Sequence, residues 1–234
     1  MKAMIVIPTY NEMENITRLI PEVLAQDKGV EILVVDDNSP DGTGDSVEQI
    51  TQENNRVHLL RRPGKMGLGT AYISGFRYSL QRPDINCIFE MDADFSHRPS
   101  YIPDFLKAVE SADVVLGSRY VKGGGVKNWG LSRKFLSRGG SIFSRAMLGL
   151  PVNDCTGGFR CYRREVLETL DLDRINSQGF GFQVEMLHEC NKKGFKIKEI
   201  PIVFPDRAEG SSKMSKKIVF EAFFLVCRLR SSGR

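Results

Sequence analysis

The 234-residue sequence has only three histidines and one tryptophan, and its five cysteines are scattered without a CxxC pair. This odd, dispersed cysteine set argues against a disulfide framework or a cysteine zinc site and favours a reducing, cytoplasmic environment. The histidines form no HxxxH or HxH pattern, which disfavours a histidine metal site. The sequence also lacks a Walker A loop and a GxSxG motif, which argues against P-loop and serine-nucleophile chemistry.

Long apolar runs are missing as well. A membrane-spanning helix needs about 20 predominantly apolar residues, and the nearest run is the 12-residue IVFEAFFLVCRL at 218–229, which carries Glu221 and Arg228. Because this run is apolar nearly all round and ends in arginines, it favours a helix at a membrane interface or against a partner protein. Packing of the same helix on the core is the alternative. We expect a catalytic domain over 1–214 and this amphipathic helix over 215–234.

Basic residues are unevenly distributed, although the formal net charge is only +4. Residues 119–145 hold seven Lys or Arg and no Asp or Glu, and residues 207–234 hold seven basic residues against two acidic ones. This asymmetry indicates an anionic partner such as a phosphate, a nucleic acid or an acidic membrane. The neighbouring side chains are mainly aliphatic, which favours a lipid phosphate over a nucleic acid.

Short apolar runs alternate with helical patterns through the first half of the chain. The strand-like runs lie at 4–7, 31–35, 57–60, 86–91 and 114–116. The helical patterns between them lie at 11–24, 45–54, 67–80 and 103–110. Repeated β-α-β units predict an α/β fold with a mostly parallel sheet flanked by helices. Polar motifs follow the first, second and fourth strands, so we expect one ligand site at the carboxyl edge of the sheet, most commonly a nucleotide site.

The strongest chemical signal is Asp92-Ala93-Asp94, directly after the apolar run that ends at Met91. In extended backbone, residues two apart point to the same side, so both carboxylates can meet one hard divalent cation. Such a cation would bridge diphosphate oxygens and stabilise a leaving nucleoside diphosphate. Taken alone, the pair is equally typical of a solvated turn; the other motifs favour the metal.

Three weaker motifs complete the expected nucleotide site. IPTYNE at 7–12 offers Tyr10 for stacking and Glu12 as a hydrogen-bond acceptor, and Asp37 follows the second strand, where an acid often binds a ribose or a base edge. The Gly-rich loop around Lys65 and Gly69 precedes a helix and allows close approach of an anion. Each motif is also typical of an ordinary turn.

The basic segment predicts a phosphate site of a different kind. If residues 132–148 are helical, Arg133 and Ser137 lie one turn apart on one face, where a guanidinium fork and a hydroxyl can bind a phosphate. Arg207 and Lys213 belong to a polar loop that could close over phosphates. The alternatives are an amphipathic surface helix with solvated arginines and a solvated loop.

Together and in order, these motifs resemble those of the family-2 glycosyltransferases, which have the GT-A nucleotide-diphospho-sugar transferase fold. They look specifically like the single-domain dolichol-phosphate (polyprenol-phosphate) mannose synthases without transmembrane helices. The resemblance covers nearly the whole chain. IPTYNE at 7–12 and VVDDNSPDGT at 34–43 mark the broad family, whereas LSRKFLSRG at 131–139 and DRAEGSSKM at 206–214 are more specific to the polyprenol-phosphate branch.

The resemblance implies inverting transfer of mannose from GDP-mannose to a dolichyl or polyprenyl monophosphate. It implies a protein peripheral on the cytosolic face of a membrane, with small membrane partner subunits in some cases and no nucleic acid. The implied metal, Mg²⁺ or Mn²⁺, would be bound by Asp92 and Asp94, which with Arg119 and Arg133 form the catalytic set. The implied donor contacts are Pro8, Tyr10, Glu12, Asp37, Lys65, Gly69 and Ala93. The implied acceptor contacts are Arg119, Arg133, Ser137, Arg207 and Lys213.

Two alternatives stay open at the level of sequence. One is the same chemistry with UDP-glucose or another nucleotide sugar as the donor. The other is a nucleotide-binding subunit without catalysis that tethers partners at a membrane; the intact Asp-Ala-Asp and arginine sets argue against it. Some relatives carry Gln two residues after the second metal Asp, where this chain has Ser96, so a third protein ligand to the metal is in doubt.

Overall fold

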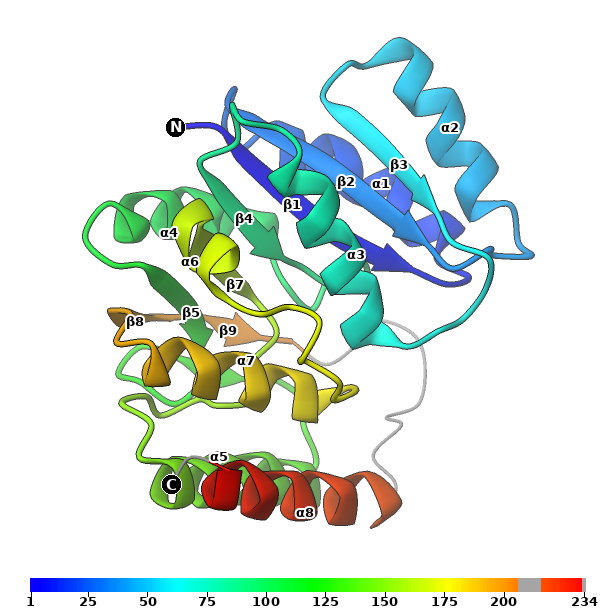
Figure 1. Ribbon diagram of the computed structural model, residues 1–234. Helices are drawn as coiled ribbons and strands as arrows, with labels where there is room; N and C mark the ends of the chain where they lie inside the picture. The colour runs from blue at the N-terminus through cyan, green and yellow to red at the C-terminus, as the bar shows by residue number, and fades with distance from the viewer. Residues whose placement is uncertain (206–215, 233–234) are drawn as a thin grey trace.

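A computed structural model describes residues 1–205 and 216–232, with side chains in the last helix described from 223 to 231. Its main sheet has seven strands in the order β3-β2-β1-β4-β7-β5-β8 (Figure 1). These strands are β1 (Ala3–Thr9), β2 (Val30–Asp36), β3 (Val57–Arg61), β4 (Cys87–Glu90), β5 (Val114–Ser118), β7 (Arg160–Arg163) and β8 (Ile197–Pro201). Only β7 runs against its neighbours, so the expectation of a mostly parallel sheet is confirmed.

Helices cover both faces of this sheet, as the repeated β-α-β pattern predicts (Figure 1). They are α1 (Met13–Leu24), α2 (Thr43–Glu53), α3 (Leu68–Leu80), α4 (Ile102–Val109), α5 (Leu131–Leu148), α6 (Arg164–Thr169), α7 (Phe180–Lys192) and α8 (Lys216–Ser232). A short 3-10 turn, η1 (Pro99–Tyr101), precedes α4. A second, two-stranded sheet joins β6 (Gly125–Val126) to β9 (Val203–Phe204).

The central strands carry side chains into two separate hydrophobic cores, because successive residues of a strand point to opposite faces. In β1, Met4 and Val6 pack with α3, α6, α7 and α8 on one face. Ala3, Ile5 and Ile7 pack with α1, α2 and α4 on the other. All five side chains are fully buried, which explains why the strand reads as a continuous apolar run rather than as an alternating one.

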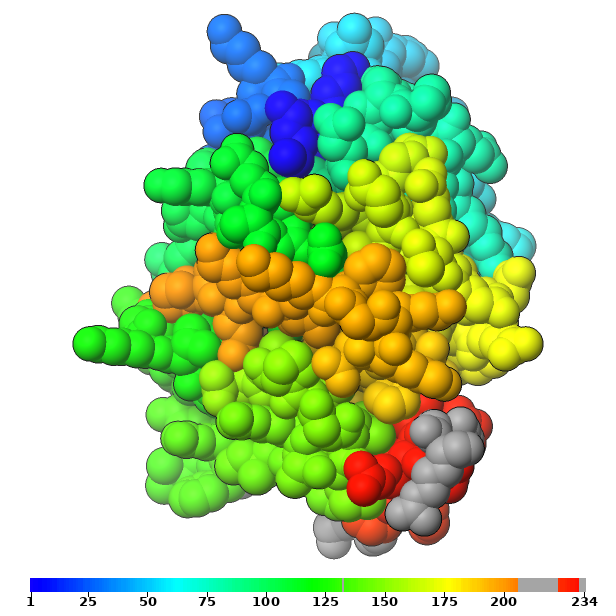
Figure 2. Space-filling model, turned by 60° about the vertical axis from the view of Figure 1, so that its left-hand side comes forward, coloured from blue at the N-terminus to red at the C-terminus, as the bar shows by residue number. Residues whose placement is uncertain are grey.

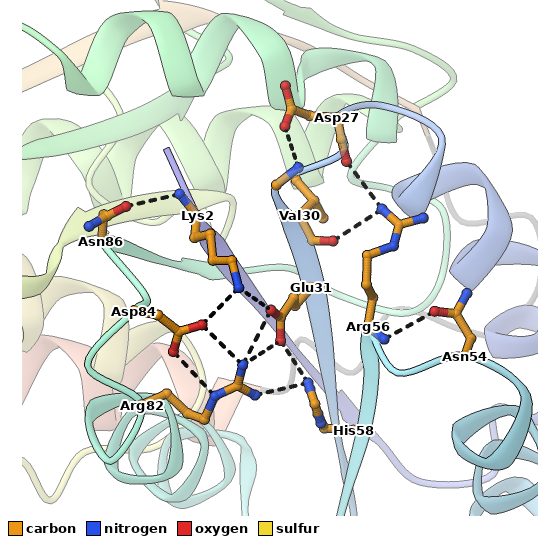
Figure 3. A network of polar contacts seen from close by, with 11 residues as sticks. Lys2, Asp27, Val30, Glu31, Asn54, Arg56, His58, Arg82, Asp84 and Asn86 are labelled. Carbon is orange, nitrogen blue, oxygen red and sulfur yellow. Dashed lines mark hydrogen bonds and ion pairs between the residues drawn. The ribbon is translucent and has the colours of Figure 1, made fainter.

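The amino ends of the strands are joined by a network of charges around Glu31 (Figure 3). Glu31 Oε2 lies 2.8 Å from His58 Nε2 and accepts a hydrogen bond of 2.9 Å from Arg82 Nη2. Lys2 contacts both Glu31 and Asp84, at 3.4 and 2.8 Å. Burial opposes the charged form of Glu31, but the bonds from His58, Arg82 and Lys2 outweigh it and hold its pKa below the ordinary value.

Helices α5 and α8 lie side by side at one end of the molecule (Figures 1 and 2). The Phe143 and Phe223 rings stack between them with centroids 5.1 Å apart, and Arg230 donates a hydrogen bond to the carbonyl oxygen of Met147. The buried face of α8, which includes Leu225 and Leu229, packs into the core. The helix expected in this region is therefore present, and part of it is anchored to the domain. Among the described residues, no helix is both long enough and apolar enough to cross a bilayer.

Candidate active site

Five parallel strands deliver the candidate site residues to one edge of the sheet. Tyr10, Asp37, Arg62, Asp92 and Arg119 follow β1, β2, β3, β4 and β5 closely, at their carboxyl ends. β5 belongs to this group because it is antiparallel to β7, which is itself antiparallel to β4. The expected gathering of the motifs at the carboxyl edge is confirmed.

The loops at this edge carry strained backbone. Four described non-glycine residues adopt positive φ, namely Asn11, Asn38, Phe95 and Asn128. Asparagine tolerates this left-handed region, whereas a bulky residue such as Phe95, at φ 58°, does not adopt it without a cost of the order of 1 kcal/mol or more. Phe95 follows Asp94 directly, so the tight turn after the acidic pair is maintained by its surroundings.

A side chain of α3 and two bonds within the loop after β4 hold the acidic pair. Tyr72 of α3 donates a hydrogen bond of 3.0 Å to Asp92 Oδ1, and the Asp92 backbone N–H donates one of 2.9 Å to His97 Nδ1. Asp94 Oδ1 accepts a hydrogen bond from the Ser96 backbone N–H. The pair lies in the loop after β4, which ends at Glu90, so the carboxylates are positioned by these bonds rather than by extended strand geometry as the sequence suggested.

The negative charges near the acidic pair also act on Tyr72. Burial raises the pKa of the Tyr72 hydroxyl well above its ordinary value, and the charges of Asp92, Glu90 and Asp94 raise it further. Burial also raises the pKa of Glu90 to about 7, although the Arg160 charge and the bonds from the Gln183 amide and Tyr162 hydroxyl act in the opposite direction. The three acidic side chains therefore lie close enough to Tyr72 for their charges to raise its pKa.

The residues present suit a hard divalent ion shared with a substrate. Among the described residues, no group of three or more His, Cys, Asp or Glu side chains could enclose a metal. Asp92 and Asp94 offer two carboxylates, and Ser96 Oγ is buried beside them without a hydrogen-bond partner among the described residues. Mg²⁺ typically takes one or two carboxylates and completes its shell with water and substrate phosphates. An Asp pair open to a diphosphate fits that pattern.

The expected donor side is assembled around Asp37. Its carboxylate lies 2.7 Å from Arg62 Nε and accepts a hydrogen bond from the Met66 backbone N–H. Burial raises the pKa of Asp37, and Arg62 opposes that shift. Lys65 Nζ, from the same Gly-rich loop as Met66, lies 4.2 Å from the centre of the Tyr10 ring. The structure thus brings together the three motifs that follow β1, β2 and β3.

Other residues expected on the donor side are occupied by contacts within the protein. Glu12 Oε2 accepts a hydrogen bond from Asn15 Nδ2. Pro8 lies within β1, and Ala93 is buried between the two metal-site acids. Gly69 packs closely: a Cβ there would lie 2.6 Å from the Ser177 carbonyl oxygen and 2.9 Å from the Phe182 ring. The start of α3 therefore lies too close to Ser177 and Phe182 for a larger side chain, which accounts for the glycine at position 69.

On the expected acceptor side, Arg119 is paired with Asp154, which the sequence placed in a Gly-rich structural turn and not among the expected site residues. Its Nε and Nη2 donate hydrogen bonds of 2.7 Å to the two oxygens of Asp154, and Nη2 also bonds Thr156 Oγ1. Both side chains are almost completely buried. Burial opposes charge on Asp154, yet Arg119 holds its pKa below the ordinary value. Within the described part of the chain, no hydrogen bond uses Arg119 Nη1.

The basic helix is present as expected. α5 spans Leu131–Leu148, so Arg133 and Ser137 do lie one turn apart. Ser137 Oγ accepts a hydrogen bond of 2.8 Å from the Tyr120 hydroxyl. The Arg133 guanidinium lies 3.9 Å from the centre of the Trp129 ring. Arg207 and Lys213, the other expected acceptor contacts, lie outside the described residues.

Several site residues escaped the sequence-based interpretation. They are Arg62, Tyr72, His97, Trp129 and Asp154. Two of them carried a usable signal: Trp129 is the only tryptophan and lies within the acid-free basic segment, and Asp154 opens a Gly-rich turn. Arg62 and Tyr72 bond to residues 25 and 20 positions away in the chain, which no local pattern encodes, whereas His97 bonds to Asp92 five positions away in the loop after β4.

Comparison with known proteins identifies the family. Residues 4–171 match the model of glycosyl transferase family 2. The chain belongs to this family. It is similar over its full length to an undecaprenyl-phosphate mannosyltransferase from Micrococcus luteus, with 47% identity and 96% of that protein covered. A polyprenol monophosphomannose synthase from Mycolicibacterium smegmatis is 43% identical over the whole chain, with 88% of that protein covered.

Solved structures confirm the GT-A-like fold of this glycosyltransferase. Glucosyl-3-phosphoglycerate synthase from Mycobacterium tuberculosis superposes with a TM-score of 0.70 at 17% identity, covering 98% of this chain and 80% of that one. A mannosyltransferase from Pyrobaculum calidifontis, solved with GDP-Man and Mn²⁺, superposes with a TM-score of 0.60 at 15% identity, covering 99% of this chain and 73% of that one.

Proposed function

We propose that this glycosyltransferase transfers mannose from GDP-mannose to a polyprenyl monophosphate, with inversion at the anomeric carbon. The observation that carries the proposal is the placement of an acidic pair, Asp92 and Asp94, and a basic cluster, Arg119 and Arg133, along one edge of a GT-A-like sheet. Two full-length relatives whose names state mannosyl transfer to undecaprenyl phosphate and polyprenol monophosphomannose synthesis support the sugar and the acceptor class.

The donor occupies the side built by β1, β2 and β3. Tyr10 and Asp37 are proposed to hold the nucleoside, and Lys65 lies beside them, where an ammonium group can meet a phosphate. Asp92 and Asp94 would bind Mg²⁺ or Mn²⁺, which when present neutralises the charge on the departing nucleoside diphosphate. Tyr72 and the backbone bond to His97 fix the orientation of Asp92 for that purpose.

The acceptor occupies the side built by β5 and α5. Its phosphate is proposed to meet Arg119 Nη1, the Arg133 guanidinium and the Ser137 hydroxyl, with Arg207 and Lys213 as further contacts. A phosphate monoester is already anionic near neutral pH, because its second pKa is about 6. It can attack the anomeric carbon directly, so a strong general base is unnecessary. Catalysis then consists of aligning two anionic reactants and stabilising the charge on the leaving group.

The end of the molecule formed by α5 and α8 suits contact with a membrane surface. Its exposed apolar side chains are Leu131, Phe135, Leu136 and Ile142 on α5 and Phe223 and Phe224 on α8. Basic residues, including Arg133 and Lys134, lie on the same helix α5, a combination typical of interfacial helices. We propose that this face rests on the cytosolic surface of a membrane, which would deliver the lipid phosphate next to Arg133.

The experiment is a transfer reaction with the purified chain, a polyprenyl phosphate in detergent, and GDP-mannose or UDP-glucose in parallel reactions. Mass spectrometry identifies the product, and NMR of the anomeric centre reports the stereochemistry. We expect a β-mannosyl phosphate from the α-linked donor, and retention of configuration would contradict the proposed single displacement. Product from UDP-glucose alone would support the alternative donor. Binding of GDP without any transfer by the purified chain would favour a non-catalytic role or a requirement for membrane partner subunits.

A further inference from the structure

Five side chains on the acceptor side form an alternating row of cations and aromatic rings, in the order Arg133, Trp129, Arg119, Tyr120 and Arg138. The guanidinium carbon of Arg133 lies 3.9 Å from the Trp129 ring centre, and that of Arg119 lies 5.4 Å from the same ring. Arg119 is also 5.3 Å from the Tyr120 ring centre, and Arg138 is 6.0 Å from it. All four distances fall within the usual range of a cation–π contact, about 6 Å.

This row concentrates positive charge where acids are scarce. Residues 119–145 contain no Asp or Glu, and the Arg119 guanidinium bonds only one acid among the described residues, Asp154. Neighbouring guanidinium groups repel one another unless something attractive separates them. The negative faces of Trp129 and Tyr120 supply that attraction, because an aromatic face is drawn to a cation.

The two rings are themselves fixed. The Phe204 ring meets Trp129 edge to face, with centroids 5.6 Å apart, and the short β6–β9 sheet holds Phe204 in place. Tyr120 is fixed through its hydroxyl, which donates to Ser137 Oγ on α5. Trp129 is 7% exposed, and its Nε1–H is buried without a hydrogen-bond partner in the described structure. A buried N–H without a partner is unfavourable, so the N–H does not explain a tryptophan at this position. The contribution of Trp129 is therefore its ring face, which contacts the two guanidinium groups.

We propose that Trp129 and Tyr120 are positioning residues for the acceptor phosphate. Their faces set the separation and direction of the three guanidinium groups before the lipid phosphate arrives, so little reorganisation remains for binding. Arg138, at the outer end of the row, joins Arg119 and Arg133 as part of the phosphate-binding set. The inference rests on the proposed function, because it concerns the acceptor of that reaction.

Paired substitutions separate the ring face from the other features of each residue. Trp129→Phe and Tyr120→Phe keep an aromatic face, whereas Trp129→Leu and Tyr120→Leu keep apolar bulk only. Tyr78→Leu is the matched control, since Tyr78 is a half-buried aromatic near His58, at the far edge of the sheet. The measurements are kcat and KM for a soluble C10 isoprenyl phosphate, KM for GDP-mannose, and the melting temperature.

We expect both leucine variants to raise the acceptor KM roughly tenfold, the scale of a partly desolvated cation–π contact. Donor KM should stay near that of the wild type, and the phenylalanine variants should retain most of the acceptor affinity. Trp129→Leu also lowers the melting temperature, because Trp129 is buried against Phe204. A purely structural role predicts another pattern, with parallel losses for donor and acceptor. That pattern, an unchanged acceptor KM, or equal losses in the phenylalanine and leucine variants would overturn the proposal.

Intrinsic fluorescence gives a readout that does not depend on turnover, because Trp129 is the only tryptophan in the chain. Titration with the C10 phosphate should change its emission saturably, Tyr120→Leu should shift the midpoint to higher concentration, and the C10 alcohol should have no effect. If the phosphate binds in this way but no sugar is transferred, the proposed function fails while the phosphate site stands. If transfer proceeds and neither emission nor acceptor KM responds, the row has no role in acceptor binding and the function stands.

Discussion

At the scale of single residues, the acidic pair in the loop after β4 is held by the Tyr72 hydroxyl of helix α3. Tyr72 is fully buried, stacks on Phe182 with ring centroids 5.9 Å apart, and bonds Asp92. Its helix begins next to the Gly-rich loop that we assign to the donor. Tyr72 therefore links the proposed metal site to α3, and the start of α3 borders the proposed donor site.

We predict that Tyr72→Phe weakens metal use while preserving the fold. The ring and its packing remain, but Asp92 loses the donor that orients it, and losing such a bond typically costs about tenfold or more in metal affinity. The Mn²⁺ concentration for half-maximal transfer should rise by about that factor. Mn²⁺ binding in the presence of GDP, followed by electron paramagnetic resonance, should weaken in parallel. An unchanged Mn²⁺ affinity would show that Tyr72 has no part in holding Asp92.

The Arg119–Asp154 pair leads to a prediction about stability. Asp154→Leu leaves a buried guanidinium without its acid, which costs about 3 to 5 kcal/mol. The double variant Arg119→Met/Asp154→Leu removes both charges and should recover much of that loss. Urea unfolding of the two variants measures the difference. If the double variant is no more stable than Asp154→Leu, the loss comes from packing or from the backbone N–H groups of Arg119, Thr156 and Gly157 that bond Asp154, rather than from the unpaired charge.

At the scale of elements, α5 and α8 form one surface with a buried and an exposed side. The buried side explains why α8 remains attached to the domain: Leu225, Val226 and Leu229 lie in the core. The exposed side includes Phe135, at 77% exposure, and Phe224, at 67%. We propose that these exposed apolar side chains belong to the membrane contact surface.

We predict that Phe135→Ser combined with Phe224→Ser weakens binding to anionic vesicles at least about tenfold, since each buried phenylalanine contributes roughly 1.5 kcal/mol or more. Activity on the soluble C10 phosphate should be nearly unchanged, because both rings are exposed and neither belongs to the proposed site residues. Met13→Ser, on α1, is the control for an exposed apolar residue elsewhere. Vesicle flotation provides the measurement, and equal flotation of wild type and double variant would rule out this face as the membrane contact.

The elements also show what a sequence can reveal. The strand and helix patterns of the first 120 residues match the observed elements to within a few residues, because continuous apolar runs and helical spacing encode burial directly. β7 was not predicted. Its sequence, RCYR, begins with Arg160, a fully buried cation whose guanidinium bonds the carbonyl oxygens of Cys155, Gly157 and Gln183. Pattern-based interpretation treats arginine as a surface residue, so this strand gave no apolar signal.

At the scale of the whole molecule, the candidate site is built mostly from pairs far apart in the chain. Asp92 and Asp94 were identified from sequence because their chemistry is carried by one short motif. Tyr72 and Asp154 were not, because Tyr72 meets Asp92 across 20 residues and Asp154 meets Arg119 across 35. Periodicity shows which face of an element is buried, but not which distant side chain it will meet.

The charge network at the amino ends of the strands predicts the acid stability of the whole fold. The folded pKa of Glu31 lies below its ordinary value of 4.5, so its contribution is complete above about that pH and is lost as pH falls through the folded pKa. Glu31→Gln should lower the melting temperature by several degrees at pH 7, and the gap to the wild type should narrow below about pH 4.5. Glu90 titrates in the wild type and in Glu31→Gln alike, so its effect on stability cancels from the difference between their melting temperatures. A gap that stays constant down to pH 3 would contradict the assigned role of Glu31.

The most direct measurement of the central claim is a competition assay in one vessel. Equal concentrations of GDP-mannose and UDP-glucose are supplied with a polyprenyl phosphate and Mn²⁺, and the product mass is determined for wild type and for Asp94→Ala. We predict mannosyl product from the wild type, its loss on chelation of the metal, and a fall of at least about a hundredfold in the variant. Glucosyl product from the wild type, or near-normal turnover by Asp94→Ala, would contradict a metal-dependent mannosyl transfer at this site.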